Sequence, residues 1–251
     1  MRIRWKTRAG PVAVALGAIL ISAQLTAAAT YSPPHADVFS FNYPGDSTGK
    51  SLPTRISGTN AFNKLNGMGY HAYDITEISA ATSISSTNGG SDAVWAHFGH
   101  GRPGAVPFHT SSGYSELKAS SQVPNLVQSW PIANINTMSG LNDIRLMVFA
   151  ECNSANSAIP TVTYPYGNLL YGAQDAGVDA ALGFSGTIYW PMMDGWSTIF
   201  FQTLGQGNDV KASAVNAASY VLYAYGVYAG TDTYSILNST TKIVPPAYGT
   251  P

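Results

Sequence analysis

The sequence predicts one α/β domain, a three-layer arrangement in which helices flank a largely parallel central sheet. Two apolar runs support this prediction, residues 93–101 (AVWAHFGHG) and residues 146–150 (LMVFA). Continuous apolar runs of this length are typical of strands that are covered on both faces. Segments with helical spacing alternate with such runs, and this alternation favours a parallel sheet. No internal repeat and no linker divides residues 30–251, so we expect a single domain.

The first half of this domain should contain three strands and one helix. Gly67 and Gly69 stand where the helix would end, and the second and third strands are joined by a polar segment, residues 80–92, with the composition of a surface loop. Residues 102–123 are rich in Gly, Pro and Ser, and a loop of that size usually serves binding. The strands are expected at residues 37–43, 70–78 and 93–101, and the helix at residues 60–68.

The second half continues the alternation of strands and helices. Asp194 can cap a helix that carries an apolar stripe, and the next helix carries one too. Both stripes are best explained as side chains of the core. Two prolines near the end exclude a central position for the last strand, which we place at an edge of the sheet. The elements are a short helix or turns at residues 126–141, a strand at 146–150, a helix at 167–176, a strand at 178–184, helices at 194–205 and 210–225, and a strand within 234–246.

Residues 1–29 have the order of a secretory signal peptide. Four basic residues within the first eight positions precede an apolar stretch, residues 11–25, and then three alanines that end at Ala29. The apolar stretch is shorter than the roughly 20 residues that a bilayer requires. We therefore expect cleavage near Ala29, a secreted or otherwise extracytoplasmic protein, and no membrane anchor after cleavage.

The charge of the chain argues against a nucleic-acid partner. The predicted signal peptide holds four of the twelve basic residues and none of the thirteen acidic ones, so eight basic residues remain against thirteen acidic ones, a formal charge of −5. Binding to nucleic acid needs a concentrated basic face.

Cys152 is the only cysteine of the chain, and it follows the apolar run at residues 146–150. An exported protein with one cysteine cannot form an internal disulfide, so the thiol is either a small buried hydrophobic group or a nucleophile. Its position alone leaves both interpretations open. In parallel sheets ligands bind beyond the carboxyl ends of the strands, where Cys152 lies and where His97 and His100 end another apolar run.

The order of residues along the chain restricts the thiol chemistry, because a cysteine nucleophile needs a base within reach. No histidine follows Cys152, which excludes the papain-like order. The last arginine is Arg145, which excludes the sortase-like order, in which an arginine follows the cysteine. What remains is a histidine followed about fifty residues later by the cysteine, each at the end of a strand, the caspase-type order.

The segments AHFGHG and MVFAECNSA resemble the paired signatures of the caspase-like (clan CD) cysteine peptidases, above all their CHAT-domain and gingipain-like branches. Residues 167–196 are similar too, since Trp190, Pro191 and Asp194 match the Trp-Pro-x-x-Asp that opens a helix in CHAT domains. The resemblance covers roughly residues 92–220. It implies a caspase-like fold and a thiol peptidase that hydrolyses a peptide or protein substrate without a metal or cofactor.

The resemblance also implies roles for individual residues. His100 would be the base and Cys152 the nucleophile, and the backbone N–H groups of Gly101 and Cys152 would form the oxyanion hole. His97 precedes His100 by three positions, so on a regular strand it faces the other side and packs behind the dyad.

The substrate pocket would follow the fifth strand, where Ser185, Trp190 and Asp194 occur. A carboxylate in that pocket would favour Lys or Arg in the substrate, and we place Asp194 first and Glu151 second as its source. An aspartate before an apolar helical stripe is also the usual N-cap, so a purely structural role for Asp194 stays open.

Three functions therefore compete. The first is a secreted cysteine endopeptidase, and the second is an extracellular binding module that keeps the caspase-like fold without turnover. The third is a zinc site made of His97, His100 and Cys152, which is disfavoured because the two histidines face opposite ways and no fourth ligand is evident. Fold alone does not decide among them.

Overall fold

The computed structural model describes residues 32–43, 52–85, 89–138, 140–159 and 167–249. All of them except Ser32 belong to one unit, Pro33–Pro251. The signal peptide predicted for residues 1–29 lies outside the described residues. Within the described ranges, no helix has both the length and the apolar character needed to cross a membrane.

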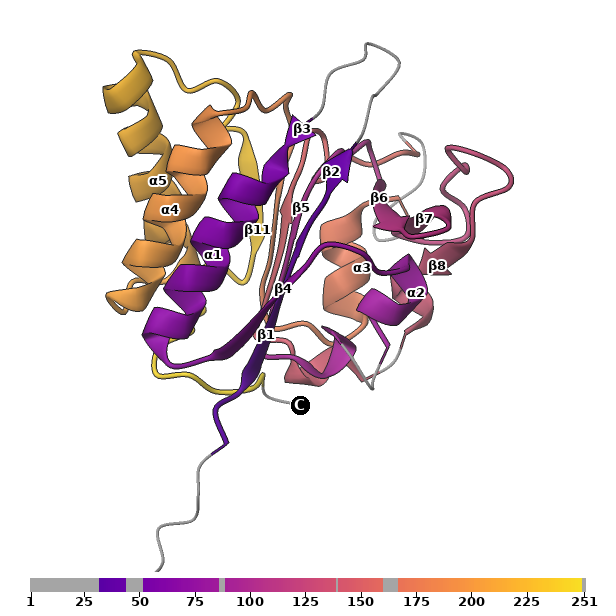
Figure 1. Cartoon of the computed structure of the whole chain (residues 1–251), viewed down its shortest axis with the longest axis horizontal. Helices are drawn as coiled ribbons and strands as arrows, with labels where there is room; N and C mark the ends of the chain where they lie inside the picture. Colours follow the sequence, from indigo (N-terminus) through magenta and orange to yellow (C-terminus); the bar gives the residue numbers. More distant parts are fainter. Residues whose placement is uncertain (1–31, 44–51, 86–88, 139, 160–166, 250–251) are drawn as a thin grey trace, which may run out of the picture. The chain divides into compact units, whose positions relative to one another are not determined.

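A six-stranded sheet forms the centre of the fold, with the strand order β11-β10-β9-β5-β1-β4 (Figure 1). Each neighbouring pair is parallel except β10 and β11, which run antiparallel at one edge. This confirms the predicted α/β class and the edge position of the last strand. The strands are β1 (His35–Ser40), β4 (His71–Ile75), β5 (Val94–Phe98), β9 (Leu146–Ala150), β10 (Ala181–Phe184) and β11 (Tyr234–Leu237).

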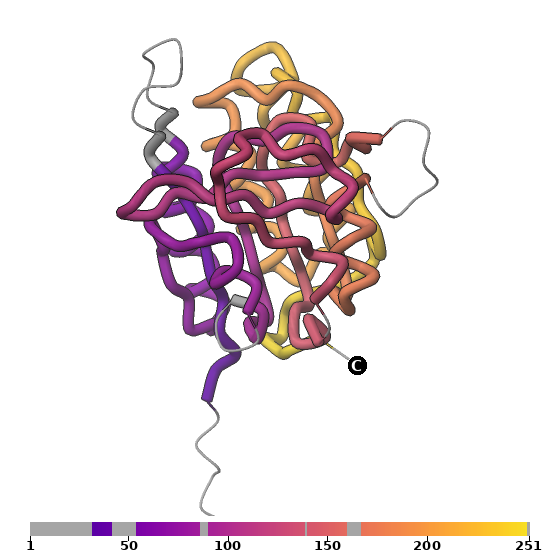
Figure 2. The backbone as a smooth tube through the Cα atoms, turned by 90° about the vertical axis from the view of Figure 1, so that its right-hand side faces the viewer, coloured from indigo at the N-terminus to yellow at the C-terminus, as the bar shows by residue number. Residues whose placement is uncertain are grey.

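Layers cover both faces of the sheet, as the predicted three-layer arrangement requires. The three long helices lie on one face, and a small three-stranded sheet with two short helices lies on the other (Figures 1 and 2). The first layer contains α1 (Thr54–Met68), α4 (Met192–Gly205) and α5 (Val210–Tyr225). The second contains α2 (Ala80–Ser83), α3 (Leu169–Asp175), β6 (Ala105–Thr110), β7 (Gly113–Lys118) and β8 (Ile132–Asn134). Smaller elements are β2 (Asn42–Tyr43), β3 (Leu52–Pro53) and the 3₁₀ turns η1 (Gly89–Ser91), η2 (Ile135–Thr137) and η3 (Leu141–Asp143).

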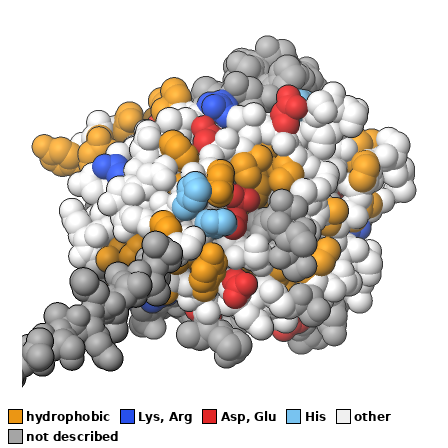
Figure 3. Space-filling model, turned by 60° about the horizontal axis from the view of Figure 1, so that its bottom comes forward, with side chains coloured by type: hydrophobic (Ala, Val, Ile, Leu, Met, Phe, Trp, Pro, Cys, Tyr) orange, Lys and Arg blue, Asp and Glu red, His pale blue; other side chains and the backbone are white. Residues whose placement is uncertain are grey.

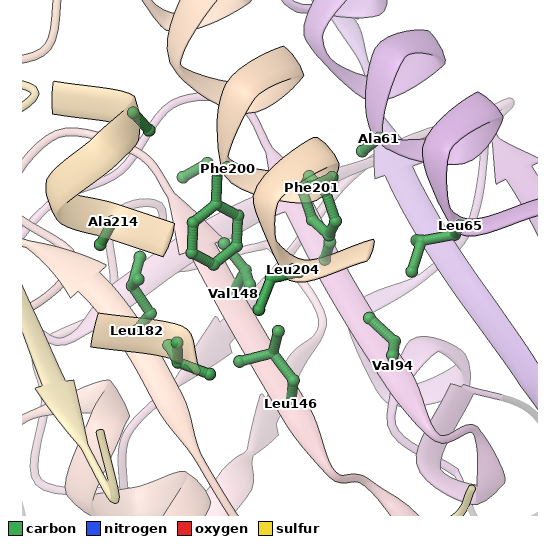
Figure 4. Close-up of a cluster of buried hydrophobic side chains, with 14 of the residues drawn as sticks. Ala61, Leu65, Val94, Leu146, Val148, Leu182, Phe200, Phe201, Leu204 and Ala214 are labelled. Atoms are coloured by element: carbon green, nitrogen blue, oxygen red, sulfur yellow. The ribbon is translucent and has the colours of Figure 1, made fainter. Parts of the chain in front are cut away.

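One apolar core lies on each face of the sheet, because successive side chains of a strand point to opposite faces. In the helix-side core, Val148 of β9 packs below Phe200 and Phe201 of α4 (Figure 4). In the core on the other face, Trp95 of β5 and Phe149 of β9 lie in contact, with ring centroids 5.3 Å apart. Burying one such side chain contributes about 1.5–3 kcal/mol, so these strands are held from both sides.

The structure corrects the expected loop at residues 102–123, most of which is the antiparallel hairpin β6–β7. The composition of this segment indicated a loop, but Glu116 and Lys118 of β7 are buried and bonded within the fold. Arg102 binds Glu116 with Nη2–Oε1 at 2.7 Å, and Lys118 Nζ donates to the carbonyl of Val123 at 2.6 Å. Residues 105–118 therefore have the composition of a loop but form two strands of a small sheet.

Other boundaries differ from the prediction. The first helix begins at Thr54, six residues before its expected start, and ends before Gly69, whose φ of +97° suits glycine. The expected polar loop at residues 80–92 contains α2 and η1, and residues 126–141 contain β8 and η2. Asp194 is not the N-cap of α4, because the helix starts two residues earlier and Pro191 precedes it.

Candidate active site

The parallel pairing of β5 and β9 sets the geometry of the candidate site. Phe98 pairs with Ala150 at the carboxyl end of the two strands, and both side chains lie in the helix-side core. His100 and Cys152 each follow two residues later, so both come just after the carboxyl ends of two adjacent parallel strands, here called the rim. Both side chains are partly exposed.

Cys152 is held by the segment that follows β10. The backbone N–H of Ile188 donates to Cys152 Sγ at 3.2 Å, and the thiol lies 3.7 Å from the carbonyl oxygen of the same residue. Asn153, in the left-handed region with φ of 58°, donates its N–H to the carbonyl of Gly186 at 3.0 Å. These contacts fix the sulfur at the rim, with its position set by β9 on one side and by residues 186–188 on the other.

Ser154 joins the end of β9 to β10. Its buried hydroxyl donates to the carbonyl of Phe149 at 2.9 Å and accepts the N–H of Phe184 at 3.0 Å. A hydroxyl that donates and accepts in this way satisfies backbone groups that the two strands leave unpaired where they diverge.

Gly101 brings the end of β5 into direct contact with the cysteine segment. A Cβ built on Gly101 would lie 2.5 Å from the Cβ of Glu151 and 2.7 Å from the carbonyl oxygen of Cys152. Side chains essentially never approach backbone so closely, so only glycine permits this separation. The residue after His100 thus lies against the residues before and at the candidate nucleophile.

A buried histidine–glutamate pair lies on the face of the sheet opposite the helices. His97 Nδ1 is bonded to Glu151 Oε1, and His97 Nε2 lies 3.1 Å from the carbonyl oxygen of Pro107 on β6. Both side chains are fully buried. Burial lowers the pKa of His97 to about 3, against the opposing effect of the Pro107 bond. Burial, and next the charge of Cys152, raises the pKa of Glu151 well above its usual value.

This position corrects the pocket role considered for Glu151. Its carboxyl group is enclosed and bonded to His97, so it does not line a surface that a substrate side chain could reach in this structure. His97 does lie behind the end of β5, as the strand alternation predicts, since it belongs to the aromatic side with Phe108 at a centroid distance of 4.5 Å. Among the described residues, no group of three or more His, Cys, Asp and Glu is arranged to hold a metal.

The other predicted pocket residues lie around the segment after β10. Ser185 is exposed and donates its hydroxyl to the carbonyl of Thr233 at 2.9 Å, while Trp190 is partly buried against the helix-side core. Asp194 lies in the first turn of α4 and accepts a hydrogen bond from the hydroxyl of Ser57 on α1. Burial raises the pKa of Asp194, while the Ser57 bond opposes that shift.

Sequence reasoning missed two contributors to the site. Ile188 acts through its backbone, which no residue pattern reveals. Ser154 follows Cys152 by two positions, and a serine in the turn after a strand was the available signal for a hydroxyl that satisfies diverging backbones.

The largely parallel sheet with layers on both faces matches the caspase-like fold of solved cysteine proteinases. A solved structure with this fold is that of gingipain R, an Arg-specific cysteine proteinase, which matches with a TM-score of 0.54 and 13% identity over 84% of this chain and 48% of that one. The complex of the pro- and mature domains of Porphyromonas gingivalis RgpB gives a TM-score of 0.55 and 13% identity, over 86% of this chain and 49% of that one.

The chain therefore spans about half the length of the gingipain chains that it matches. The separase–securin complex of Saccharomyces cerevisiae also matches, with a TM-score of 0.46 and 14% identity over 83% of this chain and 12% of that one. No protein-family model matches the sequence, and no curated protein matches it. The nearer resemblance to CHAT domains stays a prediction.

Proposed function

We propose that this protein is a cysteine endopeptidase with His100 as base and Cys152 as nucleophile. The observation that supports the proposal most is the pairing of β5 and β9, because His100 and Cys152 each follow the last residue pair, Phe98 and Ala150, by two residues. Ligand sites of parallel α/β sheets lie beyond the carboxyl ends of the strands. Solved cysteine peptidases share the fold, which raises the expectation without assigning the activity.

The proposed reaction has two stages. His100 takes the thiol proton of Cys152, the sulfur attacks the scissile carbonyl carbon, and the proton passes from His100 to the leaving amine as the C–N bond breaks. His100 then takes a proton from water as it attacks the thioester carbon, the C–S bond breaks, and His100 returns that proton to the Cys152 sulfur as the acid product leaves. The N–H groups of Gly101 and Cys152 stabilise the oxyanion, and the close approach of Gly101 to the Cys152 backbone supports this pairing.

Peptide hydrolysis by the mature chain tests the proposal. Cys152→Ala and His100→Ala are expected to lower kcat/KM by at least about 100-fold, because general-base catalysis contributes about 10²–10⁴-fold. His71→Ala is the matched control, since His71 begins β4 at the opposite end of the sheet. If His100→Ala and Cys152→Ala cleave peptides as well as the wild type does, the dyad is wrong. If the wild type cleaves nothing and Cys152 is inert, the non-catalytic binding module replaces the peptidase.

The substrate preference proposed is for Lys or Arg before the scissile bond, with Asp194 as the carboxylate beside Trp190. Support comes from the position of Asp194, which is partly exposed in the first turn of α4 and follows the segment after β10. Its bond to Ser57 gives a competing structural role, as a tie between α1 and α4. Asp194→Asn should lower the cleavage of basic relative to neutral sites by about tenfold or more, a loss typical of a desolvated charge pair. Unchanged ratios with a lower thermal midpoint would assign Asp194 to structure alone.

Export is part of the same proposal and rests on the order of residues 1–29. N-terminal sequencing of the exported protein should find a start near Thr30, and an intact Met1 would contradict it.

A further inference from the structure

The buried pair of His97 and Glu151 has no role in the reaction as proposed above, although it adjoins Cys152. It connects three elements, since His97 is on β5, Glu151 directly follows β9, and Pro107 is on β6. Phe41, Trp95 and Phe108 surround the His97 ring with centroid distances between 4.5 and 6.1 Å. An ionisable pair enclosed by aromatic rings is costly to bury if it is charged, so the positions of its protons decide that cost.

The bond to Pro107 fixes the proton on one nitrogen. A carbonyl oxygen only accepts, so His97 Nε2 carries a hydrogen and donates it at 3.1 Å. In a neutral imidazole Nδ1 is then the acceptor, and the hydrogen in its bond to Glu151 Oε1 must belong to the carboxyl group. The alternative is an imidazolium paired with a carboxylate.

The second carboxyl oxygen separates the two alternatives. Glu151 Oε2 is buried and finds no hydrogen-bond partner among the described residues. In a carboxylate this oxygen would carry half of a buried, unpartnered negative charge, whereas in a carboxylic acid it is a carbonyl oxygen and costs far less to leave unpaired. The neighbouring Cys152 offers no compensation, because a thiolate there would add a like charge. The pKa of His97, lowered by burial, and that of Glu151, raised by burial, have the directions expected for a neutral pair.

We propose that Glu151 is a permanently protonated carboxylic acid which donates to the neutral His97, and that this pair positions Cys152. Glu151 acts as a positioning residue, since it holds the end of β9 against β5 and the β6–β7 hairpin while the next side chain, Cys152, faces the rim. Gly101 contacts the Glu151 side chain directly, so the same carboxyl also supports the segment after His100. The positioning role rests on the proposed peptidase function; the protonation state does not.

Two spectroscopic measurements on the full mature chain test the protonation state. With ¹⁵N-labelled histidine, the His97 signal, assigned by its loss in His97→Asn, should be that of a neutral ring protonated at Nε2 at pH 7. The infrared spectrum should show the C=O stretch of a buried carboxylic acid that disappears in Glu151→Gln. An imidazolium signal from His97 and no such band would overturn the proposal.

Two substitutions test the positioning role. Glu151→Gln keeps a donor for His97 Nδ1, and kcat and the rate of Cys152 alkylation should stay within about threefold of wild type. Glu151→Leu removes the donor, and both rates should fall by about tenfold or more with KM nearly unchanged, as expected for loss of one buried hydrogen bond that orients a reacting group. Circular dichroism and the thermal midpoint check folding, and Asp92→Leu, a buried acid at the opposite end of the sheet, controls for general destabilisation.

The outcomes separate the two claims. Equal losses in Glu151→Gln and Glu151→Leu favour an ion pair and contradict the inference, while unchanged rates in both variants contradict the positioning role. A wild type that cleaves peptides but shows an imidazolium at His97 overturns the inference and leaves the dyad standing. A wild type with an unreactive Cys152 overturns the dyad and the positioning role together. The spectra would then still show whether Glu151 or His97 carries the proton they share.

Discussion

Buried acids are the residues in which this fold departs most from expectation. Asp37 on β1 and Asp92, just before β5, are both buried and share a hydrogen bond at the amino end of the sheet. His35 Nδ1 lies 3.9 Å from Asp92 Oδ1. That end of the molecule faces the viewer in Figure 3, where histidine side chains gather beside acidic ones. Burial, and next the charge of Asp37, raises the pKa of Asp92 to about 9.

The shift at Asp92 gives the stability a definite dependence on pH. In the folded chain Asp92 keeps its proton up to about pH 9, whereas in the unfolded chain it loses it near pH 4. Unfolding therefore releases a proton between these values, and the free energy of unfolding should fall as pH rises, by at most about 1.4 kcal/mol per unit. Asp92→Asn, which keeps a donor for Asp37, should flatten that slope between pH 5 and 8 in denaturant titrations.

Asp175→Asn is the control for this prediction, because Asp175 is exposed at the end of α3 and should leave the slope as it is. Parallel curves for wild type and Asp92→Asn would show that Asp92 is ionised in the fold at neutral pH.

The sequence predicted two candidate residues but not what surrounds them. A lone cysteine and a His-Gly pair at the ends of apolar runs carried that prediction, and the structure confirms the two runs as adjacent parallel strands. Glu151 was considered as a carboxylate of the substrate pocket, second to Asp194, and such a role needs an accessible side chain. Its burial depends on His97 and the hairpin, and that contact joins segments more than fifty positions apart in the sequence.

Of the contacts between elements, the one between the ends of β5 and β9 holds the candidate site together. Gly101→Ala would place a methyl group 2.7 Å from the Cys152 carbonyl oxygen, so one segment must move. We expect a loss of about 1–3 kcal/mol of stability, as for overpacking in a dense interior, together with a fall in peptidase activity. Denaturant unfolding and peptide turnover measure the two effects.

Gly67→Ala is the matched control within a helix. A Cβ there meets no atom within 4 Å, and alanine favours helix, so the substitution should be neutral or stabilise by up to about 1 kcal/mol with turnover unchanged. Equal effects of the two alanines would show that the approach of Gly101 to Cys152 is not tight.

The elements were predicted where periodicity was strong. The apolar stripe along residues 210–225 predicted a helix with its observed bounds, and in the structure Asp209 caps that helix and Gly226, with φ of 75°, ends it. The β6–β7 hairpin was missed because its composition is that of a surface loop, whereas Glu116 and Lys118 are polar and nevertheless buried. Their burial is tolerated only through partners elsewhere, and a local pattern does not contain those partners.

For the whole molecule, the sheet order follows from the same physical rules as its layers. Four of the five neighbouring pairs are parallel, so their connections cross over the faces and carry the helices there. The carboxyl ends of β5 and β9 consequently share one rim although about fifty residues separate them. Alternation of strands and helices predicted this class, whereas the strand order had to come from the structure.

The reactivity of Cys152 tests the central claim most directly. Iodoacetamide alkylation of the mature protein should be measured from pH 6 to 8 for the wild type, His100→Ala and His71→Ala, with the modified residue identified by mass spectrometry. If His100 takes the proton of Cys152, the wild type and His71→Ala should react alike and His100→Ala should react about tenfold or more slowly near neutral pH. Equal rates in all three proteins at every pH would show that no dyad exists at this rim.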